Sequence, residues 1–214
     1  FLSGEGDRVL FELQTKLGGE VRKTKVKDLP KKYSASYTSS YSGTPLIPEG
    51  ERRQKNYCRG GDRMQPGRYA PTYNKYLLDF IGKENLIVEV GILKGTGLGI
   101  WNLLFPNSQV IGLDIDTDNF LSNFNSLQSL GAFTDLEVNT NSEKNIFDNK
   151  LSCFYFDQWD LDSNVEFFKA ILGDRKINIF IDDGDHQATP NIRTFKAALP
   201  HLAENFVYII EDVC

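Results

Sequence analysis

Short apolar runs and amphipathic segments alternate along the last two thirds of the chain. The apolar runs predict strands, because they are short, rich in β-branched and aromatic residues and apolar on both faces. They cover residues 86–90, 109–116, 151–160, 177–181 and 205–212. The segments between them repeat apolar residues at helical spacing and predict helices over 98–105, 119–131, 163–172 and 189–202, with one more helix at 71–83. This alternation predicts an α/β fold, a doubly wound (Rossmann-like), mostly parallel sheet with helices on both faces.

The first part of the chain has a different character. Residues 6–19 predict a short helix, and the stretch from there to residue 60 is rich in Ser, Tyr, Lys and Gly without periodicity. We therefore expect two parts: a helical and loop-rich arm or lid over 1–60, and a single α/β domain over 61–214. Within that domain the polar, Asn-rich residues 134–150 predict a loop insertion. Since the chain begins with Phe1 and ends soon after its last strand, we expect it to be a segment of a longer protein.

Charge divides the chain in the same way. Residues 1–76 hold 15 Lys and Arg against 8 Asp and Glu, whereas residues 77–214 hold 9 against 21. The basic residues are scattered rather than clustered, which argues against a nucleic-acid partner and favours solvated surface or contacts to an anionic substrate. No apolar run reaches the roughly 18 residues of a membrane span, and the start has no signal-peptide pattern, so we expect a cytoplasmic protein. Cys58, Cys153 and Cys214 have no zinc-site spacing and are interpreted as free thiols.

Acidic residues stand at the carboxyl end of every predicted strand. In such a sheet, ligands bind at the carboxyl ends of the strands, so these side chains should meet at one edge. An edge this acidic suits a cationic ligand, a metal ion or both. In strand order the residues are Glu89; Asp114 and Asp116; Asp157, Gln158 and Asp160; Asp182, Asp183, Asp185 and His186; Glu211 and Asp212.

The turn after the first strand, "GILKGTG", is rich in glycine. It is not a dinucleotide fingerprint, because the third glycine expected after Gly95 and Gly97 is Ile100. Asp114 follows Gly95 by 19 residues, at the end of the second strand, where a carboxylate can bind both hydroxyls of a ribose. The pattern favours a nucleoside without a pyrophosphate, with a plain structural turn as the alternative.

Residues 86–116, "LIVEVGILKGTGLGIWNLLFPNSQVIGLDID", resemble the S-adenosylmethionine site of class I methyltransferases, and most closely the macrocin and mycinamicin type of sugar O-methyltransferases. Three further stretches carry the same resemblance: "GDRMQPGRYAPTYNKYL", "FDQWD" and "FIDDGDHQATPNIRTFKAALPHLAENFVYIIED". A more general likeness, carried by no single motif, is to the methyltransferase module of a chlorovirus glycan-assembly protein. It implies rhamnose as an acceptor, linked glycosyltransferase domains or a homo-oligomer, and a host cytoplasm.

The resemblance implies a role for each matching residue. It implies methyl transfer from S-adenosylmethionine to a sugar hydroxyl, with a divalent cation, magnesium in this family, as second cofactor. The cofactor would be bound by Glu89, Gly91, Gly95, Asp114, Asp157, Gln158 and Tyr69. The metal would be bound by Asp183, Glu211 and Asp212, with Asp183 and the general base His186 as catalytic residues.

The metal site also has physical support. The last two strands should be neighbours in the sheet, so Asp183 can approach Glu211 and Asp212. Three carboxylates in one pocket repel one another unless a cation compensates, and oxygen ligands suit magnesium. The alternative is that these acids form turns and cap helices. His201, the second histidine, lies in a loop and is interpreted as incidental.

The match has departures. The family has Ser where this chain has Asp185, and a second His where this chain has Pro190. Thr189 and Pro190 instead predict the N-cap and first residue of a helix. The chain stops soon after the last strand, where class I methyltransferases continue with an antiparallel hairpin. Either the chain is cut there or the fold ends early, and a missing hairpin would leave an exposed sheet edge. Two other hypotheses remain open: a hydroxylase-like relative of the same fold, and a non-catalytic domain that binds a cation or another ligand in the acidic pocket.

Overall fold

The structure is a computed structural model that describes residues 69–129, 131–134, 136, 145–148 and 150–212. The predicted arm over 1–60, with its short helix, lies outside the described residues, and so do Cys58 and Cys214. Within the described part no helix is both long and apolar enough to cross a membrane.

Helices and strands alternate in the described part, as the apolar pattern predicts. The helices are α4 (Ala70–Leu77), α5 (Thr96–Leu104), α6 (Asp118–Ser129), α7 (Leu161–Leu172) and α8 (Ala188–Ala198), with 3-10 turns η4 (Leu78–Phe80) and η5 (Leu199–His201). The strands are β1 (Leu86–Val90), β2 (Gln109–Asp114), β3 (Asn145–Asp148), β4 (Leu151–Tyr155), β5 (Ile177–Asp182) and β6 (Leu202–Ile210).

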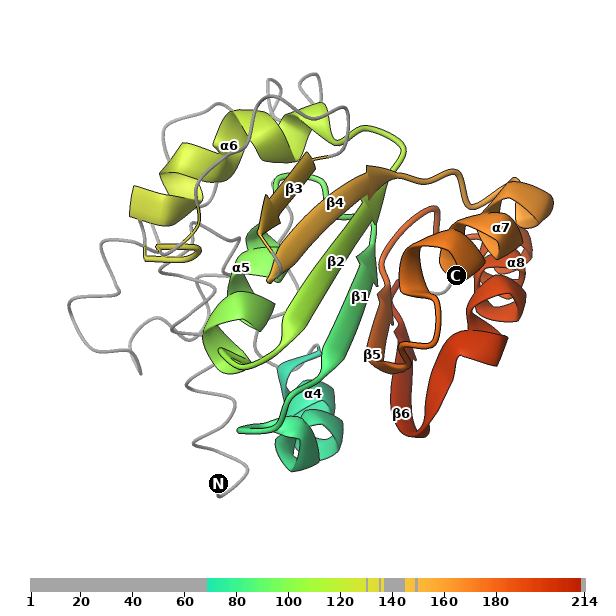
Figure 1. The fold of residues 1–214 in the computed structure, drawn as a ribbon, viewed down its shortest axis with the longest axis horizontal. Helices are drawn as coiled ribbons and strands as arrows, with labels where there is room; N and C mark the ends of the chain where they lie inside the picture. Colours follow the sequence, from blue (N-terminus) through green and yellow to red (C-terminus); the bar gives the residue numbers. More distant parts are fainter. Residues whose placement is uncertain (1–68, 130, 135, 137–144, 149, 213–214) are drawn as a thin grey trace, which may run out of the picture.

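These strands form one six-stranded sheet in the order β3-β4-β2-β1-β5-β6 (Figure 1). Within this order each neighbouring pair among β4, β2, β1, β5 and β6 is parallel. The order reverses between β1 and β5, because the chain winds outward from β1 first to one side and then to the other. The predicted doubly wound parallel sheet is confirmed.

Three local predictions are corrected. Residues 134–150 were expected to be a loop, but β3 pairs antiparallel with β4, in an irregular register between Ile146 and Asp148. A strand of four residues within a polar stretch depends on its partner and is too short to show a periodicity of its own. Helix α8 begins at Ala188 after Gln187, so Thr189 is not its N-cap, and Pro190 lies in the first turn, where no N–H is needed. The strand expected at 205 begins at Leu202.

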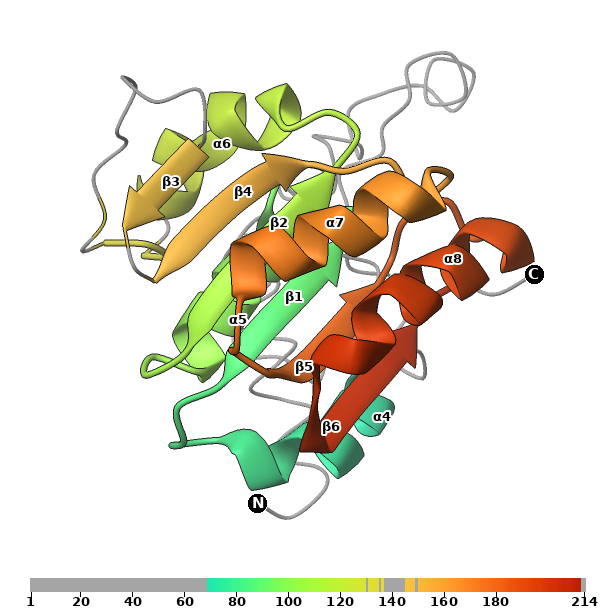
Figure 2. The same ribbon diagram turned by 45° about the vertical axis from the view of Figure 1, so that its right-hand side comes forward.

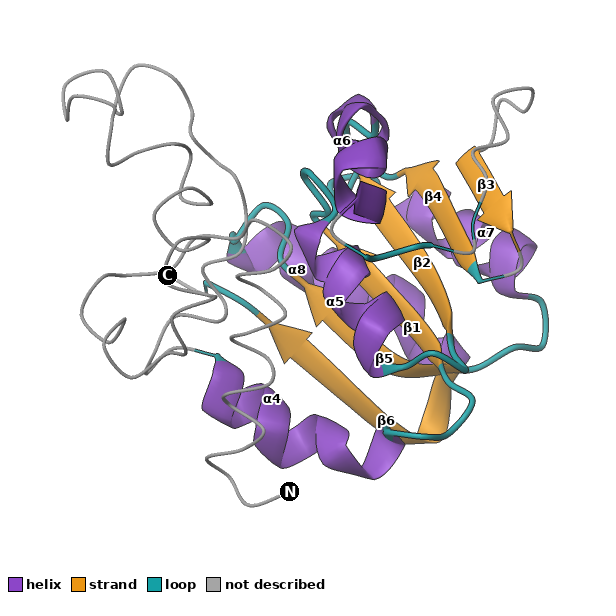
Figure 3. Cartoon of the chain, turned by 90° about the vertical axis from the view of Figure 1, so that its left-hand side faces the viewer, coloured by secondary structure: helices purple, strands orange, loops and turns teal. Residues whose placement is uncertain are grey.

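Two apolar clusters lie on opposite faces of the sheet. Helices α7 and α8 cover one face, with Phe168, Leu172 and Ala198 against Val88 and its neighbours (Figure 2). Helices α4, α5 and α6 cover the other face (Figure 3), where the buried residues include Tyr73, Leu77, Trp101, Phe120 and Phe124. The continuous burial of β1 follows from this double cover.

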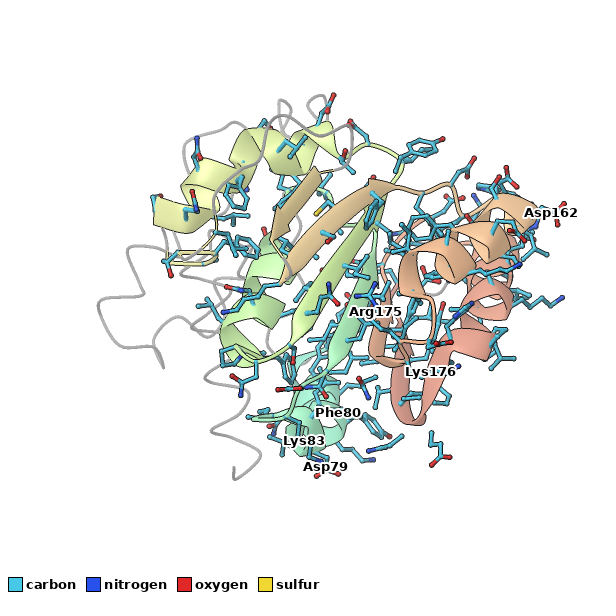
Figure 4. The ribbon with its side chains drawn as sticks, viewed as in Figure 1. Asp79, Phe80, Lys83, Asp162, Arg175 and Lys176 are labelled. Carbon is cyan, nitrogen blue, oxygen red and sulfur yellow. The ribbon has the colours of Figure 1, made fainter. Side chains whose placement is uncertain are left out.

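Acidic residues stand at or just after the carboxyl ends of β1, β2, β4, β5 and β6. The opposite end carries both signs of charge: Lys83, Arg175 and Lys176 precede strands β1 and β5 there, and so do Asp79, Glu84 and Asp174 (Figure 4). The Lys176 ammonium donates to the carbonyl of Pro200 at 2.8 Å. The acidic edge is therefore the end at which a cationic ligand would be attracted.

Candidate active site

The site lies where the turns after β1, β5 and β6 meet. Gly91 follows β1, has a φ of 82° and donates its N–H to the carbonyl of Leu113 at 2.8 Å. Asp183 follows β5 and donates its N–H to the carbonyl of Val90 at 2.9 Å. The backbone thus ties the turn after β5 to the end of β1.

The two glycines predicted in the cofactor site are required by the packing of the protein itself. A Cβ on Gly91 would lie 2.0 Å from the carbonyl oxygen of Asp183. A Cβ on Gly95 would lie 2.1 Å from the ring of Phe120, and Gly95 has a φ of 76°. Both positions need glycine whether or not a ligand is bound, so glycine alone is not a sign of a ligand here.

Asp114 lies at the end of β2, half-buried, as the ribose prediction requires. Its carboxylate accepts hydrogen bonds from the backbone N–H of Leu93 at 2.9 Å and of Asp116 at 3.0 Å. These contacts orient the carboxylate and leave lone pairs for further donors. Leu93 has a φ of 45°, so the turn that contacts Asp114 is held in an uncommon conformation.

Glu89 is a buried carboxylate, with an exposed fraction of 1%. The indole of Trp101 on α5 donates to its Oε2 at 3.0 Å. The Trp101 ring in turn packs against Tyr73 of α4, with 5.3 Å between ring centroids. Glu89 is therefore held deep beneath the turn after β1.

Asp183, His186 and Asp212 converge. One ligand atom from each, a carboxylate oxygen or an imidazole nitrogen, lies within 4.8 Å of the others, and all three side chains are half-buried. His186 has a φ of 57° and Asp212 a φ of 51°, conformations that non-glycine residues rarely adopt. The Nδ1 atom of His186 is buried and makes no hydrogen bond within the described part of the chain.

Glu211 was predicted as a third metal ligand but is not a member of this group. Its side chain is completely buried, and its Oε1 accepts a hydrogen bond from the phenol of Tyr73. The next residue, Asp212, is bound by the phenol of Tyr69. Burial is the largest cause that raises the pKa of Tyr69 to about 12, followed by its bond to Asp212, so this phenol is a donor at neutral pH.

Gln158 is buried and joins three elements. Its amide nitrogen donates to Asp182 at 2.8 Å and to Thr194 of α8 at 3.0 Å, and its oxygen accepts from the N–H of Asp185 at 2.8 Å. Both amide protons are thus used, so a contact to adenine, as predicted, would have to come from the remaining lone pair or the backbone. Asp157 lies half-buried beside it and accepts from the N–H of Trp159.

Asp182 is an acid that the sequence left open between support of the turn and contact with the substrate. It is buried and accepts from Gln158 and, at 3.3 Å, from the phenol of Tyr208. Burial raises the pKa of Asp182 despite these hydrogen bonds, and burial likewise raises the pKa of Tyr208. This pair supports the end of β5 from the face covered by α8.

Some strand-end acids are capping residues, as the alternative interpretation held. Asp160 caps α7 by accepting from the N–H of Ser163 at 3.0 Å. Asp116 accepts from the N–H of Asp118 at 2.9 Å at the start of α6. The outer acids thus begin helices, and the inner acids near β5 and β6 converge.

Solved structures with a similar chain path exist. The MycE methyltransferase of the mycinamycin biosynthetic pathway, in complex with Mg and SAH, matches 89% of this chain at 19% identity, with TM-scores of 0.51 and 0.50 in two crystal forms. The chain has the class I methyltransferase fold. A curated relative, the mycinamicin VI 2''-O-methyltransferase of Micromonospora griseorubida, is 26% identical over 156 residues, which cover 68% of this chain. The resemblance to the macrocin and mycinamicin type is confirmed by these matches.

The chain spans about a third of the length of these class I methyltransferases: 31% of the curated relative and 38% and 36% of the two solved chains. No model of a protein family matches it. What the relatives bind and methylate is therefore a property of those longer proteins and extends to this chain only by proposal.

Sequence reasoning missed a group of side chains next to this candidate site. Trp159 is 44% exposed, and its indole donates to the carboxylate of Asp185 at 2.6 Å. The guanidinium of Arg193, on α8, lies 5.6 Å from the Trp159 ring centroid. The sequence offered no explanation for Asp185. Its carboxylate orients Trp159 and so links the turn after β5 to the turn after β4. Only the departure from the family pattern at Asp185 could have signalled it.

Proposed function

We propose that this chain is the catalytic domain of an S-adenosylmethionine-dependent O-methyltransferase whose acceptor is a sugar hydroxyl. The observation that carries the proposal is the convergence of Asp183, His186 and Asp212 within 4.8 Å, at the carboxyl ends of β5 and β6. In this fold that edge is where a ligand binds. Glu89 and Asp114 lie at the ends of the neighbouring strands β1 and β2.

The donor set fits a divalent cation. Ligand atoms of an octahedral magnesium ion at about 2.1 Å lie roughly 3–4 Å from one another, close to the spacing in this group. Two half-buried carboxylates side by side also repel each other, and a cation compensates that repulsion. We assign Asp183 and Asp212 as ligands, with Glu211 as a further candidate behind them. When bound, the cation would polarise the acceptor hydroxyl and ease the loss of its proton.

His186 is the group we assign to proton removal. It is the imidazole in the converging group, and imidazole is the commonest general base near neutral pH. The proton of the acceptor hydroxyl moves to His186, and the oxygen attacks the methyl carbon of the donor. The new O–CH3 bond forms as the S–CH3 bond of the sulfonium breaks, and S-adenosylhomocysteine leaves with the electron pair of that bond. The ring of His186 belongs to the group that converges with the two carboxylates, and its backbone is left-handed.

The other end of the site supports a nucleoside methyl donor. Asp114 is oriented by two backbone N–H groups and keeps lone pairs for ribose hydroxyls. The buried carboxylate of Glu89 lies one strand away, next to β5, where it can attract the positive part of the donor. Donor and acceptor would thus meet at the carboxyl ends of β1 and β5. Alignment of these two reactants is the main catalytic task.

Calorimetry tests the proposal. The protein should bind S-adenosylmethionine, and Asp114→Asn should weaken that binding while leaving divalent-cation binding unchanged. Asp183→Asn should weaken cation binding, and His186→Ala should keep both ligands but lose turnover by about 10²–10⁴-fold. A chain that binds no S-adenosylmethionine at millimolar concentration contradicts the proposal.

For the acceptor we propose a deoxyhexose such as rhamnose in a glycan or glycoside. The support is the likeness to a relative named as an enzyme of O-methylation. A mass-spectrometric screen of nucleotide sugars, rhamnosides and other glycosides for a gain of one methyl group tests this choice. Methylation of a non-sugar acceptor alone would contradict it.

A further inference from the structure

Asp212 has an unusual backbone for a proposed metal ligand. Its φ is 51°, in the left-handed region, where an L-residue is disfavoured by about 1–2 kcal/mol. Such a conformation persists only where the surroundings hold it in place. The question is which group holds Asp212.

The phenol of Tyr69 makes two contacts to this one residue. Its oxygen accepts a hydrogen bond from the backbone N–H of Asp212 at 2.9 Å, and its proton is donated to Oδ1 of the same residue. A single oxygen atom thereby binds the backbone and the side chain together. This closes a ring that sets both the left-handed turn and the direction of the carboxylate.

Tyr69 is the N-cap residue of α4, and Tyr73 lies one turn further along the helix. Residues four apart lie on the same face of a helix, and the phenol of Tyr73 donates to Glu211, the neighbour of Asp212. Tyr73 is 1% exposed and packs against Trp101, so the helix is anchored in the core. Helix α4 lies alongside β6, and Val207 and Ile209 of β6 pack against the same cluster (Figure 3).

We propose that α4 is a brace for the divalent-cation site, and that Tyr69 is a positioning residue whose phenol presents the carboxylate of Asp212 to the ion without contacting the ion. The inference rests on the proposed function, because it concerns the same cation. It also revises the role of Tyr69, which the resemblance placed in the S-adenosylmethionine site. With its proton and one lone pair engaged by Asp212, the phenol acts on the cation end of the site.

The test uses Tyr69→Phe, with Tyr76→Phe as its matched control. Tyr76 is on the same helix but 49% exposed, and its ring contacts only the ammonium of Lys75, at 4.8 Å, among the contacts described. Manganese(II), measured by electron paramagnetic resonance, is the probe of the cation site, and calorimetry measures binding of S-adenosylmethionine. Tyr69→Phe should weaken manganese binding on the order of 10-fold, as loss of a group that orients a ligand does. Binding of S-adenosylmethionine should change less than about twofold, and Tyr76→Phe should match the wild type in both.

Kinetics gives a second readout once an acceptor is known. The magnesium concentration for half-maximal rate should rise for Tyr69→Phe, while kcat at saturating magnesium recovers toward the wild-type value. Unchanged manganese affinity in Tyr69→Phe overturns the inference. An equal loss of manganese and S-adenosylmethionine binding overturns it too, because that assigns Tyr69 to the fold or to the methyl-donor site. A wild-type protein that binds no manganese contradicts the proposed cation site itself, which is a separate outcome.

Discussion

Gly91→Ala is the substitution whose effect the structure defines most sharply. Gly91 has a φ of 82°, and the added methyl group would lie 2.0 Å from the carbonyl oxygen of Asp183, 2.5 Å from its carbonyl carbon and 2.9 Å from Cα of Gly184. All three atoms are backbone, so no side chain can rotate out of the way. To reach the 3.0 Å below which real Cβ contacts essentially do not occur, the Asp183 carbonyl must move by about 1 Å.

The size of the effect has two parts. The left-handed backbone alone costs an alanine about 1–2 kcal/mol. Displacement of a turn that is hydrogen-bonded to β1 adds a cost of similar size, so we expect a loss of about 2–4 kcal/mol in the free energy of unfolding. For a domain of this length that lowers Tm by about 5–15 °C.

Gly82→Ala is the control. Gly82 has a φ of 78°, and an added Cβ there meets nothing within 4 Å, so only the backbone cost of about 1–2 kcal/mol applies. Urea unfolding, with the metal-free protein in EDTA, measures both variants. Manganese binding at a temperature where both are folded should fall for Gly91→Ala alone, because Asp183 moves with the turn. If the two variants lose equal stability, the clash with the turn after β5 does not exist and the reasoning is wrong.

Three further predictions concern stability and reactivity. Trp101→Phe removes a donor from the buried carboxylate of Glu89 and should destabilise the protein by about 1–3 kcal/mol in urea unfolding; no change would contradict the hydrogen bond. Cys153 is fully buried, and burial raises the pKa of its thiol, so its peptide should stay unalkylated by iodoacetamide in the native protein and react after unfolding. Burial, with a smaller contribution from Lys176, lowers the pKa of His201 from 6.5. The contribution of this lowered pKa to the free energy of unfolding is complete above about pH 6.5 and is lost as the pH falls through the lowered value. The His201→Asn variant should therefore lose less stability than the wild type under mild acid.

The strand pattern was readable because it is local. Each parallel strand is apolar on both faces, each helix is periodic, and the acids follow the strands directly, so the fold and the acidic edge could be predicted without knowing any contact. Strand β3 was missed because it has only four residues, lies within a polar, Asn-rich stretch and is defined by its pairing with β4. The start of α8 was misplaced by two residues because Thr189 and Pro190 suit the first turn of a helix as well as its cap.

Which of the predicted site residues converge and which are buried elsewhere depends on long-range contacts that no sequence motif contains. Asp183, His186 and Asp212 could be grouped from their positions after neighbouring strands, but the burial of Glu211 against Tyr73 could not. The partnership between α4 and the residues after β6 spans more than a hundred positions of sequence. Likewise, the reason for an Asp at position 185 became visible only from the indole of Trp159.

The alternation of elements follows from the local sequence alone, and so do the sheet, its carboxyl edge and the chemical nature of the side chains that stand there. Periodicity and turn residues act over a few positions, so they can be recognised from neighbouring residues alone. Only the tertiary structure decided which acids cap helices, which ones converge, and that Tyr69 holds Asp212 in a left-handed turn. Those outcomes depend on distances between segments far apart in sequence, which the packing of helices on the two faces of the sheet sets.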